Sequence, residues 1–109
     1  MRDFFDIHAL ARGRAFEGAR LVRALRSTFE RRTTPIPEDL PVALTPEFAD
    51  TDGKRAQWEA FLSKNRIAAP APNFDSIVSD LAAFLRQPLE AAREGRGFDL
   101  TWPVGGPWR

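Results

Sequence analysis

The sequence predicts an all-α fold, a small bundle of about four main helices with an aromatic, Pro/Gly-rich C-terminal tail packed on it. Apolar residues recur at the helical spacing of three and four positions in four separate segments. No segment shows the sustained apolar–polar alternation of a half-buried strand, and β-branched residues are few. Because 109 residues is the length of one domain, we expect residues 1–109 to form a single helical domain.

The first expected helix spans residues 2–12, and Gly13 is placed to end it. Phe5 and Leu10 lie off its main stripe. The stripe itself consists of four residues at positions i, i+3, i+4 and i+7: Phe4, Ile7, His8 and Ala11.

The second expected helix spans residues 17–32 and stops before Pro35. Its apolar stripe contains Leu21, Val22, Leu25 and Phe29. Three arginines project from the opposite side: Arg20, Arg23 and Arg31. This pattern therefore predicts a helix with one buried face and one basic face.

A hydroxyl residue followed by proline, Thr45-Pro46, is a typical start of a helix, here of a short helical turn. Thr51 and Asp52 are then expected to cap a third main helix over residues 51–65. The apolar residues of that helix are Trp58, Phe61 and Leu62.

The fourth helix, expected over residues 73–94 with Asn73 as its cap, has the clearest apolar stripe of the chain. Pro88 lies inside this pattern and predicts a kink or an early end. The extended tail, residues 98–109, is too apolar to stay free and is expected to pack back on the helices. The stripe consists of Phe74, Ile77, Val78, Leu81, Phe84, Leu85 and Leu89.

Composition excludes several classes of protein. Apolar content of 43% and charged content of 28% are ordinary for a globular domain. The chain contains no cysteine, so it has neither disulfides nor thiolate zinc sites. No apolar run approaches the roughly 18 residues of a membrane helix, and the charged start is unlike a signal peptide. We therefore expect a soluble cytoplasmic protein without a membrane partner.

Several enzyme motifs are missing. The chain has one histidine and lacks G-x-S-x-G, a P-loop and G-x-G-x-x-G. His8 lies on the apolar face of its helix, which favours a packed histidine over a ligand. The D-x-D pair Asp50 and Asp52 can in principle hold magnesium, but it lies between two helices and not on a strand, so capping is the favoured interpretation.

Two other charged groups are candidates for a site. Asp3 and Asp6 share a helix face and can position a metal, a base or a nucleotide, but their spacing alone favours helix-dipole stabilisation of Asp3 and solvation of Asp6. Arg20, Arg23 and Arg31 are candidates for phosphate contact with a nucleic acid, and the alternative is a solvated helix face.

Taken in order, four motifs resemble the C-terminal part of AbiEii/AbiGii-type nucleotidyltransferase toxins. They are RDFFDI at residues 2–7, FERRTTPIP at 29–37, KRAQWEAFL at 54–62 and TWPVGGPW at 101–108. The resemblance runs from Arg2 to Trp108 and implies a DNA polymerase β-like nucleotidyltransferase of a type IV toxin–antitoxin pair.

The resemblance also implies roles for residues. In such proteins a Gly-Ser loop and a strand D-x-D pair bind Mg²⁺ and a nucleoside triphosphate, and a later block, usually R-x-K-D-x-Y-D-I, completes the site. Asp3 and Asp6 match the block's two aspartates as catalytic residues, and Arg2 takes the place of its lysine as a phosphate-binding residue. Phe5 replaces the usual tyrosine. The Gly-Ser loop and strand D-x-D pair are missing, so we expect no metal site, cofactor or transfer activity in this chain alone.

The resulting hypothesis is the C-terminal helical portion of a nucleotidyltransferase toxin. Its expected partners are an N-terminal catalytic half or a cognate antitoxin, with tRNA as acceptor for the full-length form. The alternatives are a stand-alone interaction module, dimerising through Phe5 and Leu10 of the first helix, and the remnant of a decayed toxin gene.

Overall fold

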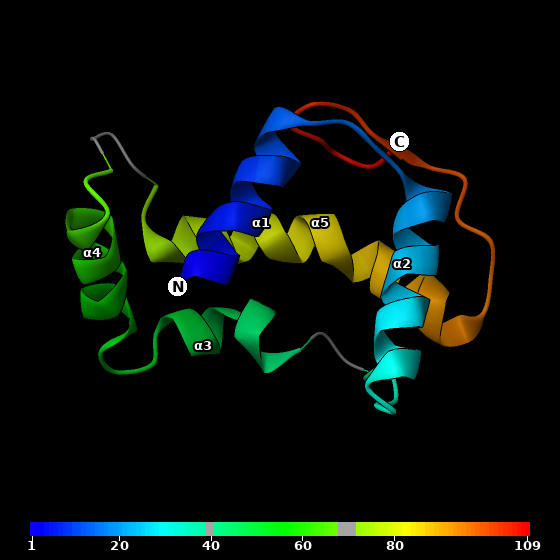
Figure 1. Ribbon diagram of the computed structural model, residues 1–109, viewed down its shortest axis with the longest axis horizontal. Coiled ribbons are helices and arrows are strands. Elements are labelled where there is room, and N and C mark those ends of the chain that lie inside the picture. The colour runs from blue at the N-terminus through cyan, green and yellow to red at the C-terminus, as the bar shows by residue number, and fades with distance from the viewer. Residues whose placement is uncertain (39–40, 68–71) are drawn as a thin grey trace.

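The computed structural model describes residues 1–38, 41–67 and 72–109 and confirms the mainly helical class (Figure 1). The longest helix, α5, runs across the middle of the molecule, with α4 beside its N-terminal end and α2 beside its C-terminal end. In chain order the elements are α1 (Arg2–Gly13), β1 (Phe16–Glu17), α2 (Gly18–Arg31), the 3₁₀ turn η1 (Val42–Leu44), α3 (Pro46–Ala49), α4 (Lys54–Lys64), α5 (Phe74–Glu94) and β2 (Thr101–Trp102).

Helix α5 is the central element, because each of the other helices and η1 packs against it. Its start is fixed by Asn73, whose side-chain oxygen accepts a hydrogen bond from the Ser76 amide at 2.8 Å. Its end is fixed by Gly95, which adopts the left-handed conformation at φ 69°. Both predicted signals are thus confirmed.

Two apolar clusters lie along α5. The first surrounds Phe74 and Trp58, whose ring centroids are 5.7 Å apart, and joins α1, α3 and α4 to the first half of α5. The second surrounds Phe84 and joins α2 and the tail to the second half. Its buried residues are Ala11, Val22, Phe84, Ala91, Ala92, Phe98, Trp102 and Trp108.

The C-terminal tail packs on the helices, as predicted. Its strand β2 pairs antiparallel with β1, with Phe16 opposite Trp102. Next to this pair, Gly18 lies so close to the tail that a Cβ atom would fall 2.4 Å from the ring of Phe98. The indole nitrogen of Trp102 donates a buried hydrogen bond of 2.7 Å to the carbonyl of Ala11, near the end of α1.

Pro88, which was expected to kink α5 or to end it early, does not end it, because the helix continues to Glu94 as the expected bounds of 73–94 require. Proline has no amide hydrogen, so it leaves the carbonyl of Phe84, four residues earlier, without its helical donor. The indole nitrogen of Trp108 donates to this carbonyl at 2.8 Å. The tail therefore supplies the hydrogen bond that proline removes.

Two expected helix boundaries also need correction. Thr51 and Asp52 do not cap α4; the N-cap is Gly53 at φ 84°, where no side-chain cap bond forms. The Lys54 amide instead bonds to the Thr51 carbonyl, so a tight turn leads from α3 into α4. Glu17 belongs to β1 and not to the helix, because pairing with the tail fixes its backbone. The Thr45 cap of α3 is confirmed.

The buried face of α1 is rotated relative to the expected stripe. Phe5, expected off the stripe, packs against Trp58 and Phe61 of α4, with ring centroids 6.4 and 5.7 Å away. Ile7, expected inside it, is 36% exposed. The reason is that α4 covers the side of α1 that carries Phe5, which the sequence of α1 alone does not show. Among the described helices, none combines the length and apolar character needed to cross a membrane.

Replacing Trp108 with phenylalanine keeps an aromatic ring and removes the indole N–H. We expect Trp108→Phe to lower the free energy of unfolding by about 1–3 kcal/mol, because the buried Phe84 carbonyl is left without a partner. Urea unfolding followed by circular dichroism measures the loss.

Pro88→Ala supplies the control, since alanine at position 88 restores the helical donor to Phe84. The cost of Trp108→Phe should then be smaller in the Pro88→Ala background. An equal cost in both backgrounds would show that the indole hydrogen bond does not compensate for the proline.

Candidate functional site

The three residues singled out by the sequence at the start of the chain lie together on the outer face of α1. Arg2, Asp3 and Asp6 are all exposed. Their spacing places them within one third of the helix circumference. Arg2 Nη1 lies 3.8 Å from Asp6 Oδ1, with the two side chains 60% and 54% exposed. The arrangement presents one cation and two carboxylates to an approaching ligand.

Arg2 is held by α4 as well as by Asp6. Its Nη2 donates to Asn65 Oδ1 at 3.3 Å, and its guanidinium carbon lies 5.6 Å from the centroid of the Phe61 ring. Asn65 is itself fixed, since its Nδ2 donates to the Phe61 carbonyl at 2.9 Å. The sequence offered no signal for this contact, because Asn65 is 63 residues away and exposed asparagines at helix ends are common.

The carboxylates do not by themselves form a metal centre. Within residues 1–38, 41–67 and 72–109 there is no group of three or more histidine, cysteine, aspartate or glutamate side chains that can hold a metal ion. Asp50 of the D-x-D pair accepts from Arg55 at 3.2 Å, and the same guanidinium bonds Asp75 at 2.8 Å. Asp50 is the C-cap of α3, and its side chain joins the ion pair between Arg55 of α4 and Asp75 of α5.

The outer face of α1 also carries exposed apolar side chains. Leu10 is 44% exposed and Ile7 is 36% exposed. Leu10 and Asp6 line a shallow hollow of about 390 Å³ near the end of the helix. Of the two residues expected to form an interaction patch, Leu10 is therefore available and Phe5 is not, because Phe5 packs against α4.

His8 lies on the opposite, buried face, as expected of a packed histidine. Its side chain is 11% exposed, and its Nε2 lies 2.8 Å from Asp80 Oδ2 of α5. This partly buried polar contact joins α1 to α5.

The predicted basic face of α2 is exposed. Arg20 pairs with Glu17 at 3.3 Å, and Arg31 bonds the Ser27 carbonyl at 3.4 Å. In the described part of the chain, Arg23 makes no hydrogen bond or ion pair. Arg20, Arg23 and Arg31 therefore share one side of α2, and their groups are accessible to solvent.

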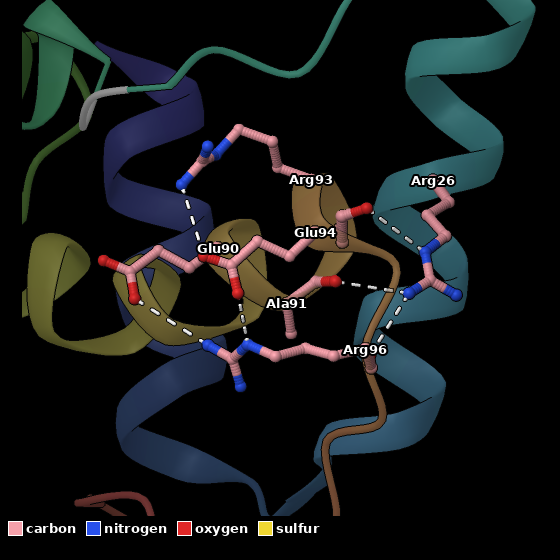
Figure 2. A network of polar contacts seen from close by, with 7 residues as sticks. Arg26, Glu90, Ala91, Arg93, Glu94 and Arg96 are labelled. Carbon is pink, nitrogen blue, oxygen red and sulfur yellow. Dashed lines mark hydrogen bonds and ion pairs between the residues drawn. The ribbon is translucent and has the colours of Figure 1, made fainter.

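A fourth arginine of α2, which the sequence did not single out, has a structural role. Arg26 reaches the C-terminal end of α5 and donates to the carbonyls of Ala91, Ala92 and Arg96 at 3.2–3.3 Å (Figure 2). These carbonyls lie at the negative end of the helix dipole, so a cation there is favoured. No signal in the sequence pointed to this contact, because the Ala91 carbonyl lies 65 residues away along the chain.

Comparison with known families now adds to this geometry. The family model described as "Nucleotidyl transferase AbiEii toxin, Type IV TA system" matches residues 1–80. The chain belongs to this family. The comparison with curated proteins gave no match, and neither did the comparison with solved structures.

The AbiEii match covers α1 to α4 and the first part of α5. It includes all the candidate site residues on α1 and α2, and family membership suggests an antitoxin partner. The tail, which holds α5 in place through Trp108, lies beyond the match. Its resemblance to the family therefore stays a prediction.

Arg26, which contacts the end of α5, and Arg23, which is exposed, should differ in their effect on the free energy of unfolding. We expect Arg26→Ala to lower the free energy of unfolding by about 1.5–3 kcal/mol, because three carbonyl contacts to a charged group are lost. Arg23→Ala, the matched control on the same helix, should change it by less than about 0.5 kcal/mol. Chemical denaturation measures both, and equal effects would contradict a structural role for the contacts of Arg26 with the end of α5.

Proposed function

We propose that this chain forms the helical part of a metal-dependent nucleotidyltransferase toxin and completes a nucleotide site with Arg2, Asp3 and Asp6. One observation carries the proposal. Arg2, Asp3 and Asp6, which in the sequence resemble the family's later block, lie together on an exposed face of α1, and this face lies inside the region that the AbiEii model matches.

The chemistry of Arg2, Asp3 and Asp6 suits contact with one side of a bound nucleoside triphosphate. A guanidinium is a planar donor that matches phosphate oxygens, and Arg2 is held in place by Asn65 and Phe61 while remaining 60% exposed. The Arg2–Asp6 contact is long enough, at 3.8 Å, to yield to a phosphate. The two aspartates can accept hydrogen bonds from a nucleotide or its acceptor.

The described residues do not fit a dedicated magnesium site. Mg²⁺ in phosphoryl-transfer sites is held by carboxylates together with substrate phosphates, and here only Asp3 and Asp6 face outward on α1. In our proposal the metal-binding carboxylates belong to a nucleotidyltransferase half with a Gly-Ser loop, and the present chain is not catalytic alone. The nucleic-acid acceptor, with tRNA as the candidate, would contact Arg20, Arg23 and Arg31 through phosphates.

The exposed apolar residues of α1 favour a second candidate function. Ile7 and Leu10 are available on the same face and can pair with a second copy of the chain, which would make it a dimerising interaction module. Sedimentation equilibrium distinguishes this function: a dimer abolished by Leu10→Glu would support it, and a monomer at all concentrations would exclude it.

The nucleotidyltransferase proposal is tested by joining this chain to the Gly-Ser-loop half of a family member and measuring transfer of labelled nucleotide to tRNA. Asp6→Asn should reduce transfer about ten- to a hundredfold, the equivalent of one hydrogen bond to a charged group. Arg2→Ala should chiefly raise KM for the nucleotide.

Glu59→Gln is a matched control, because Glu59 is an exposed carboxylate on α4 away from the outer face of α1. It should leave transfer unchanged. An active fusion in which Asp6→Asn transfers nucleotide as fast as the wild type would show that α1 does not contribute to the site.

A further inference from the structure

A groove of about 700 Å³ lies along α5, away from the candidate nucleotide residues of α1. Its lining also includes residues of η1 and α3, and Pro107 and Trp108 of the tail. The floor is formed by successive turns of α5, including Val78 and Ala82. Its size falls within the roughly 300–1,000 Å³ of ligand sites, and its lining is mostly apolar.

The groove exists because α5 presents small side chains to it. Ser79, Ala82 and Ala83 occupy neighbouring positions at i, i+3 and i+4, so no side chain of the helix fills the space. The large residues of α5 point instead into the two apolar clusters. The apolar floor is therefore open to a partner without any rearrangement of the core.

The two ends of the groove carry opposite charge. Asp50 and Asp75 line one end, and a single guanidinium, that of Arg55, serves both carboxylates. Asp75 Oδ1 has no hydrogen-bond partner among the described residues. Arg86 lines the other end and makes no ion pair in the part of the chain that is described.

The separation of these charges defines the length of a matching ligand. Asp75 and Arg86 are eleven residues apart on one helix, which at 1.5 Å per residue is about 16 Å. An extended peptide spans this distance with about five residues, at roughly 3.3 Å each.

We propose that the α5 groove binds an extended peptide segment of about five residues from a partner protein. The segment places a basic residue against Asp50 and Asp75, small apolar residues over Ala82 and Ala83, and an acidic residue against Arg86. The complementary charges set the direction in which the segment lies, and the apolar floor provides the buried contact. This binding is independent of nucleotide transfer.

The probe is a pentapeptide, Lys-Ala-Val-Ala-Glu, with both termini blocked so that only its side chains are charged. Titration into the ¹⁵N-labelled full chain should shift the amide signals of Ser79, Ala82 and Ala83 in NMR spectra, with saturation. The neutral peptide Gln-Ala-Val-Ala-Gln should bind at least about fivefold more weakly, as expected for the loss of partly exposed ion pairs.

A charge reversal gives the sharper test. Arg86→Glu lies on the surface, so the fold should persist, and it should weaken the Lys/Glu peptide at least about fivefold while strengthening a Lys-Ala-Val-Ala-Lys peptide. Arg32→Glu, an exposed arginine outside the groove, should change neither affinity.

Three results would overturn the proposal. The first is a set of shifts scattered over the surface, and the second is equal affinity for the charged and neutral peptides. The third is self-association of the chain that Arg86→Glu abolishes, because it would assign the groove to a second copy.

Discussion

The structure depends on the burial of α5, since each of the other helices packs against it and neither apolar cluster exists without it. Ten of its residues are buried, which for a helix requires cover on more than one side. The cover comes from short elements that are marginal as isolated helices in water. Their positions are therefore set by the apolar side chains of α5 against which each of them packs. Helix α1, which carries the candidate site, is one of these elements.

The tail has a specific place in this arrangement because α5 contains a proline. A free carbonyl in the middle of a buried helix costs about 1–3 kcal/mol unless another donor reaches it. Trp108 is that donor, and Trp102 in the same tail donates to the Ala11 carbonyl in the last turn of α1. The tail thus joins the central helix to the helix that carries the candidate site. A sequence change in the tail can alter the site without touching any of its residues.

The sequence predicted the features that local chemistry decides. The caps at Thr45 and Asn73 and the end of α5 at Gly95 each follow from a few neighbouring residues, and the structure has all three. The packing of the tail followed from its composition. Phe98, Trp102 and Trp108 are large apolar side chains, and they are buried only because the tail packs on the helices.

Features that depend on distant partners were not predictable in this way. On α1, Phe5 and Ile7 differ by two positions, and both can belong to an apolar face of a helix; only the position of α4 decides that Phe5 is the packed one. Arg26 reads in the sequence like its neighbours on α2, yet it is bound to the end of α5, 65 residues away. The Arg2–Asn65 contact is of the same kind.

Apart from Arg2, which contacts Asn65 and Phe61 of α4, the outer face of α1 takes little part in packing. The packing of this helix uses Phe4, Phe5, His8 and Ala11, and the polar link to the bundle is the contact between His8 and Asp80. Asp3, Asp6 and Leu10 lie on the other side, where exposed charges contribute little to the free energy of unfolding. Because one face of α1 packs and the other is exposed, substitutions on the exposed face need not unfold the protein. Its residues can therefore be selected for binding. This face presents a cation, two carboxylates and an exposed leucine to solvent, which are the groups that our proposals assign to contacts with a charged ligand and a second protein surface.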